Sequence, residues 1–162
     1  MPLQPTIFYS IVLYPLIFIF PAYVANGAPV IFGGGRPISK RIFGSHKTIK
    51  GLVTGLFAGF IIAFIISQLI SYLLITGILL TIGTHVGDLL GSFIKRRLKI
   101  KEGRKFAVFD QYLFLFFALL FALPFGKFPS PYGLLFIIVL TGLLHVLTNA
   151  LAYKANVKKV PW

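Results

Sequence analysis

Residues 51–87 read GLVTGLFAGFIIAFIISQLISYLLITGILLTIGTHVG, which is 37 residues without a single Asp, Glu, Lys or Arg. One helix of this length would measure roughly 55 Å at 1.5 Å per residue, whereas the hydrocarbon core of a bilayer is about 30 Å thick. The stretch therefore predicts two membrane-spanning helices joined by a tight turn near 68–72.

Apolar runs on both sides of this stretch predict three more spans. The first run contains no charge from Met1 to Gly35, is long enough to span, and has no basic residue ahead of it, so we interpret it as a helix rather than a secretory signal. The predicted fold is an all-α integral membrane protein, a single transmembrane domain over 1–162. Its five spans lie at about 6–25, 51–68, 71–88, 111–126 and 131–153.

Composition supports this class and excludes others. The chain is 57% hydrophobic and 12% charged, with a mean hydropathy of +0.92, which is far too little charge for the surface of a soluble domain. It has no cysteine, which excludes disulfides, thiolate metal sites and cysteine nucleophiles.

The basic residues fall almost entirely on one predicted face. The loops at 26–50 and 89–110 and the tail after 153 hold five, seven and three of the sixteen Lys and Arg, and Lys127 alone lies opposite. The positive-inside rule then puts the amino terminus outside and the carboxyl terminus in the cytoplasm. Basic loops between apolar spans indicate anionic headgroups or phosphorylated ligands, not nucleic acid.

Two of the three acids bracket the most basic loop. Asp88 ends the third predicted span and Asp110 directly precedes the fourth, with Lys95, Arg96 and Arg97 between them. Paired carboxylates suit Mg²⁺, which takes oxygen ligands and substrate phosphates together, and the basic side chains suit phosphate oxygens. The alternative is that each Asp pairs with a neighbouring Lys or Arg to orient the loop. We favour the metal–phosphate site because acids are so rare here.

The first loop contains a second candidate anion site. A glycine-rich stretch precedes Lys47 and Thr48, but a Walker motif needs Gly where His46 stands, and a preceding strand. Backbone N–H groups and basic side chains at a helix start can still bind an anion. The alternative is an ordinary basic loop.

Two further patterns concern the spans themselves. Gly55, Gly59 and Ala63, four residues apart, predict close helix packing within the chain or between two chains. In the last span, His145 and Asn149 lie one turn apart on one face. They either make an interhelical hydrogen bond or face the polar end of the site.

These segments together resemble the CDP-archaeol synthase family, archaeal enzymes distantly similar to phosphatidate cytidylyltransferases. The matching segments are ANGAPV at 25–30, GSHKTIKG at 44–51, GDLLGSFIKRR at 87–97, DQ at 110–111 and HVLTNALAYKANVKKVPW at 145–162. One difference is that Ser39 and Lys40 follow Pro37-Ile38, where related enzymes are expected to carry acids.

The resemblance implies a reaction and a set of residues. CTP and an anionic isoprenoid di-ether lipid, 2,3-bis-(O-geranylgeranyl)-glycerol 1-phosphate, would give CDP-archaeol and pyrophosphate, with Mg²⁺ on Asp88 and Asp110. The catalytic set would be Asp88, Asp110, Lys95 and Arg96. The CTP-binding set would be Asn26, Lys47, Thr48, Ser92, Lys95, Arg96, Arg97, Gln111, His145 and Asn149.

Two other functions compete with this one. A CDP-alcohol phosphotransferase would need more aspartates than the chain has. A small membrane transporter of anions or lipid phosphates would share the basic loops, but the chain has no visible inverted repeat.

Overall fold

The computed structural model describes residues 5–100 and 107–155, without the side chains at 5, 107, 108 and 110. Its regular elements are α1 (Pro5–Phe8), a π-helix η1 (Tyr9–Leu13), α2 (Tyr14–Phe32), α3 (Lys40–Phe43), α4 (Ile49–Ser67), α5 (Leu73–Arg97), α6 (Ala107–Ala122) and α7 (Pro131–Lys154). Within the described ranges, the one extended pairing is an isolated bridge between Pro37 and Thr48.

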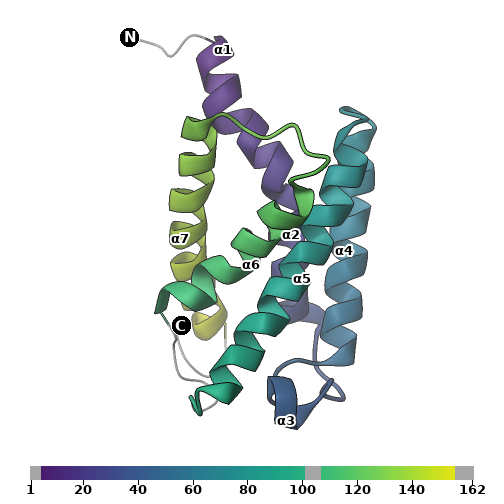
Figure 1. The fold of residues 1–162 in the computed structure, drawn as a ribbon, viewed down its shortest axis with the longest axis vertical. Helices are drawn as coiled ribbons and strands as arrows, with labels where there is room; N and C mark the ends of the chain where they lie inside the picture. The colour runs from purple at the N-terminus through teal and green to yellow at the C-terminus, as the bar shows by residue number, and fades with distance from the viewer. Residues whose placement is uncertain (1–4, 101–106, 156–162) are drawn as a thin grey trace.

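Helices α4 and α7 run close to the long axis of the molecule (Figure 1). The antiparallel pair α4 and α5 forms one side, α7 forms the other, and α6 crosses obliquely between them. The short helix α3 lies at the end of the molecule where α4 begins and α5 ends, opposite the end that carries α1. The loop that carries Lys47 is therefore next to the basic last turn of α5.

In the part of the chain that the structure describes, four helices are long and apolar enough to cross a membrane: residues 6–32, 49–67, 73–97 and 131–154. This confirms an all-helical, multi-pass protein. The segment predicted as a span at 111–126 forms a shorter apolar helix, which ends at Ala122. The reason is Pro124, which has no backbone N–H to donate and disfavours helical geometry at the residue before it.

Two helices extend further than the sequence suggested. We expected loops at 26–50 and 89–110, but α2 continues to Phe32 and α5 continues to Arg97. The first span was expected to end near residue 25, yet α2 continues through Pro29, whose carbonyl accepts a 2.9 Å hydrogen bond from the Gly33 N–H. Lys95, Arg96 and Arg97 suit the last turn of α5, because cations stabilise the negative end of a helix dipole.

Small residues allow α5 to pack tightly on two sides. The buried residues of α4 are Gly51, Gly55, Gly59 and Ala63, so the predicted stripe packs within the chain. On the other face, a Cβ at Gly83 would lie 2.4 Å from the carbonyl oxygen of Phe117 in α6. Helices that approach this closely gain van der Waals contact, which is the main attraction between helices in lipid.

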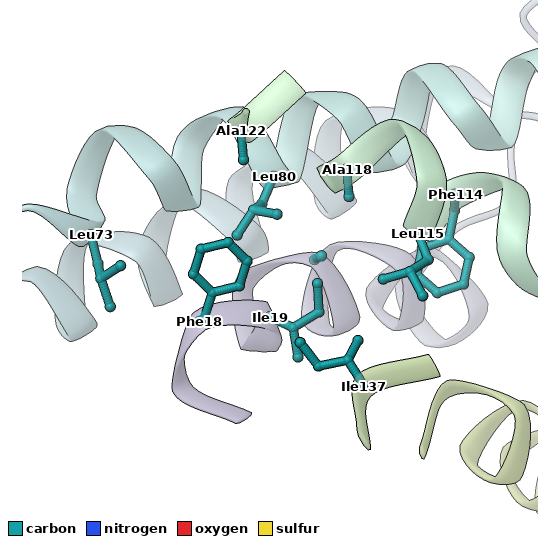
Figure 2. Packing of buried hydrophobic residues seen from close by; sticks show 10 residues of the cluster. Phe18, Ile19, Leu73, Leu80, Phe114, Leu115, Ala118, Ala122 and Ile137 are labelled. Atoms are coloured by element: carbon teal, nitrogen blue, oxygen red, sulfur yellow. The ribbon is translucent and has the colours of Figure 1, made fainter. Parts of the chain in front are cut away.

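The apolar core lies where α2, α5, α6 and α7 meet (Figure 2). Phe18 and Ile19 of α2 point toward Leu80 of α5 and Ile137 of α7, and all four are almost fully buried. The outer face of α4 is apolar and exposed instead, and the Phe57 side chain on it is 67% exposed. This distribution leaves an apolar surface suited to contact with lipid chains.

Candidate functional site

An ion pair joins the first loop to the middle helix. The Nζ of Lys47 donates to Oδ2 of Asp88, and both side chains are partly exposed. Lys47 lies just before α4, and Asp88 lies in α5, nine residues before its end. The structure thus brings together two of the residues predicted for the site, 41 positions apart in the sequence.

The loop between α2 and α4 is folded so that Lys47 faces α5. The Ile38 N–H donates to the Lys47 carbonyl at 2.8 Å, and the Ile49 N–H donates to the Arg36 carbonyl at 3.1 Å. These two bonds flank the bridge between Pro37 and Thr48 and close the intervening residues into a compact loop. These backbone hydrogen bonds therefore fix the position from which the Lys47 side chain reaches Asp88.

Thr48 begins α4. Its hydroxyl accepts a 3.0 Å hydrogen bond from the Gly51 N–H, which is the usual N-cap arrangement. The cap places the positive end of the α4 dipole beside Lys47. A Cβ at Gly51 would lie 3.4 Å from Pro29, so the start of α4 also packs against α2.

A cavity lies around this ion pair, and we call it the Asp88 cavity. It is bounded by α2, the first loop, α4 and α5, and its volume is about 80 Å³. Ligand sites for drug-sized molecules are typically several hundred cubic ångströms, so this cavity is smaller than such a site. Its lining residues are Pro29, Gly34, Ile38, His46, Lys47, Thr48, Gly51, Leu52, His85, Asp88 and Leu89.

His85 forms the inner wall of the Asp88 cavity. It lies three residues before Asp88 in α5 and is only 6% exposed. A Cβ at Gly55 would lie 2.4 Å from its ring, so glycine is what allows the imidazole to lie against α4. Within the described part of the chain, Nε2 of His85 makes no hydrogen bond. The i, i+3 spacing from Asp88 is the feature of the sequence that identifies this residue.

A second cavity lies beside the last turns of α5, and we call it the arginine cavity. Its volume is about 390 Å³, and it is lined by Arg41 and Ile42 of α3 and by Phe93, Arg96 and Arg97 of α5. The guanidinium carbon of Arg97 lies 5.2 Å from the centre of the Phe93 ring. The structure thus divides the predicted phosphate-binding residues between two cavities, with Lys47 and Thr48 in one and Arg96 and Arg97 in the other.

Other predicted residues do not line either cavity. Ser92 is buried, and its hydroxyl donates to the Asp88 carbonyl at 3.1 Å. Asn26 lies on α2, Lys95 in the last turn of α5, and Gln111 on α6. His145 and Asn149 lie on α7, and both have an interaction partner. One turn earlier in α7, the Thr141 hydroxyl bonds with that of Tyr23 at 2.7 Å.

The side chains of the other two acidic residues, Glu102 and Asp110, are not among those that the structure describes. Asp110 belongs to α6, but its side chain is not described, and neither is Glu102 or the tail 156–162. Among the described side chains, no group of three or more His, Cys, Asp or Glu could hold a metal ion. Asp88 is paired with Lys47, and a carboxylate is a ligand type that Mg²⁺ accepts.

Together these features define a multi-pass helical membrane protein with a charged site at the end where its basic residues gather. The profile of the CarS-like CDP-archaeol synthase family matches residues 8–162. The chain therefore belongs to the CDP-archaeol synthase family and is an enzyme. Family membership also removes the reason to consider a transporter.

Relatives and a solved structure agree with this assignment. The CDP-archaeol synthase of Methanococcus aeolicus is 39% identical over 94% of this chain and 97% of its own length. That of Pyrococcus furiosus is 43% identical over 90% of this chain and 95% of its own length. A solved structure described as an intramembrane enzyme for archaeal membrane lipids biosynthesis is 31% identical, with a TM-score of 0.77 over 85% of this chain and 94% of its own.

Proposed function

We propose that the protein transfers the cytidylyl group of CTP to an isoprenoid di-ether glycerol phosphate, releasing pyrophosphate and forming CDP-archaeol. The observation that carries this proposal is the Lys47–Asp88 pair, which puts a carboxylate and an ammonium group from distant segments into one cavity. The matching relatives are named CDP-archaeol synthases, which supports the same product.

The reaction requires alignment and charge neutralisation more than proton transfer. A phosphate oxygen of the lipid attacks the α-phosphorus of CTP, and the bond from that phosphorus to the bridging oxygen of the β-phosphate breaks. The lipid phosphate is already anionic near neutral pH, so no general base is needed. Positioned positive charge therefore supplies most of the catalysis.

Asp88 and Asp110 are proposed to hold Mg²⁺, which would neutralise phosphate charge when bound. Lys47 would then leave Asp88 and bind a phosphate oxygen of CTP. The size of the Asp88 cavity supports this exchange of partners, because about 80 Å³ cannot hold a nucleotide while Lys47 lies across the carboxylate. The glycines at 34, 35 and 44, all with positive φ, give the loop backbone conformations that other residues rarely adopt.

The enzyme assay is the direct test. Purified protein, labelled CTP, Mg²⁺ and the di-ether phosphate should give a labelled lipid and one pyrophosphate for each lipid formed. A folded protein that makes no labelled lipid under these conditions would contradict the proposal. Omitting the lipid is the control, because CTP hydrolysis alone would release label only into the aqueous phase.

We also propose five spans in the cell membrane, with the amino terminus outside and the site facing the cytoplasm. Helix α6 has 16 residues and reaches roughly 24 Å, so the segment 123–130 would complete the crossing. In Figure 1 this segment continues from the end of α6 to the start of α7, at the end of the molecule opposite α3. Segments on the α3 side carry the basic residues, which supports the proposed orientation.

The absence of cysteine gives this topology a clean test. K127C and K99C each introduce a single thiol, at opposite ends of the molecule. An impermeant maleimide should label K127C in intact cells and K99C only after lysis. Labelling of both in intact cells, or of K99C alone, would contradict the proposed orientation.

A further inference from the structure

The residues that line the arginine cavity are of the kinds that bind phosphate groups. Arg41, Arg96 and Arg97 converge on it from two separate elements. Among the described residues that line it, none is acidic. Guanidinium groups bind phosphate oxygens in pairs of parallel hydrogen bonds, which makes arginine suited to this ligand.

Its remaining walls are apolar. Ile42 is 44% exposed on one side, and Phe93 lies beneath the guanidinium of Arg97 on the other. A free phosphate gains nothing from such walls, whereas a phosphate attached to a hydrocarbon stem does. Stacking on Phe93 also holds the Arg97 side chain in place, which reduces the entropy that ligand binding must offset.

The cavity also lies at the depth of lipid headgroups. Helix α5 has 25 residues and is roughly 37 Å long, so its last turns extend beyond a hydrocarbon core of about 30 Å. Asp88 precedes Phe93 by five residues, or roughly 7.5 Å along the helix. A headgroup in the arginine cavity would therefore be a short distance from the Asp88 cavity.

From this arrangement we infer that the arginine cavity binds the phosphate of an anionic lipid, separately from the nucleotide site at Asp88. The inference rests on the proposed function, because the lipid phosphate is the acceptor substrate of the proposed cytidylyl transfer. It also revises the sequence-based assignment, which gave Arg96 and Arg97 to the phosphates of CTP. Phosphomonoester and phosphodiester lipids share the recognised group, and the experiment separates them.

The first measurement is lipid binding without turnover. Purified protein in neutral detergent is titrated with a dialkylglycerol phosphate, without CTP or Mg²⁺, and bound lipid is counted by native mass spectrometry. R41Q/R96Q should weaken binding by roughly tenfold for each guanidinium removed. R36Q is the matched control, because Arg36 is an exposed arginine of the same loop that does not line the cavity, and it should bind as the wild type.

Further variants separate recognition from folding. R41K/R96K keeps both charges but loses the bidentate geometry, so it should fold and bind with intermediate affinity. Replacing the probe with a dialkyl phosphodiester lipid identifies the source. Tighter binding of the monoester assigns the cavity to the substrate, and equal binding assigns it to anionic lipids in general. Wild-type binding by R41Q/R96Q, or equal weakening by R36Q, would overturn the inference.

A kinetic measurement distinguishes this inference from the proposed function. In the cytidylyl-transfer assay, R41Q/R96Q should raise the KM for the lipid and leave the KM for CTP unchanged. A raised KM for CTP with an unchanged KM for the lipid would show that these arginines bind the nucleotide, and it would overturn the inference. If no CDP-lipid forms at all, the proposed function fails, but the binding measurement still stands on its own.

Discussion

The two cavities on α5 differ in charge and size. The Asp88 cavity contains a carboxylate paired with an ammonium group and measures about 80 Å³. The arginine cavity contains three guanidinium groups and measures about 390 Å³. A paired carboxylate suits a ligand that arrives with its own cation, such as a metal–nucleotide complex. A cluster of arginines suits the phosphate group of an anionic ligand.

Helix α5 lies between α4 and α6, and its two sides have different surroundings. His85 and Asp88 face α4 and the first loop, while Gly83 and Gly87 face α6 at distances that exclude a side chain. The final turns then leave the bundle with their basic residues. One helix therefore carries both cavities, and substitutions along it should affect nucleotide and lipid separately.

The largest expected effect is that of removing the carboxylate. D88N should lower kcat by about 10³-fold or more, because the site loses its only described anionic ligand for a metal. The measurement is Mg²⁺-dependent formation of labelled lipid. E102Q makes the same chemical change in the basic loop, at an acid that the sequence places beside Lys101, and should keep activity. Near-normal turnover by D88N would remove the distinction between the cavities.

Neutralising Lys47 should affect CTP alone. K47Q is expected to raise the KM for CTP by about 10- to 100-fold, since one charge-assisted contact to phosphate is lost, and to leave the KM for the lipid unchanged. Steady-state kinetics with each substrate varied in turn measure both constants. K50Q is the matched control, because Lys50 is exposed and does not line the Asp88 cavity. Equal changes in both KM values would contradict the separation.

Adding one methyl group at Gly55, where α4 packs against His85 of α5, should destabilise the bundle. In G55A the Cβ would lie 2.4 Å from the His85 ring and 2.7 Å from the Ala25 carbonyl oxygen. Overpacking of this kind costs about 1–3 kcal/mol, so the thermal unfolding midpoint should fall. G27A is the control, since nothing lies within 4 Å of a Cβ there, and Ala suits a helix better than Gly. Equal midpoints for the two variants would show that the α4–α5 contact is looser than described.

The smallest expected effect concerns the apolar wall of the arginine cavity. F93L removes the aromatic face beneath Arg97 and should weaken lipid binding by about two- to fivefold, the range of an exposed cation–π contact. Native mass spectrometry with the dialkylglycerol phosphate measures the change. F57L alters a Phe on the exposed face of α4 and should bind as the wild type. A loss that is equally large in F57L would point to general membrane contact instead.

Much of the fold could be predicted from hydropathy, because a bilayer forces apolar segments of fixed length to become helices. The turn between α4 and α5 occupies 68–72, as the length argument requires. The ends of helices were harder to predict. Nothing in hydropathy shows that α2 continues through Pro29 or that α5 continues to Arg97, since helical backbone is equally acceptable in the headgroup layer.

Sequence by itself determined the class of protein, the gathering of basic charge and the small-residue stripe, and it predicted a role for Asp88. These depend on local composition and on spacing within one helix, which a chain carries without folding. Only the tertiary structure decided that Lys47 pairs with Asp88, and that Arg41 joins Arg96 and Arg97 in a second cavity. Both depend on how a loop folds across a neighbouring helix, and side chains many residues apart leave no pattern in the sequence.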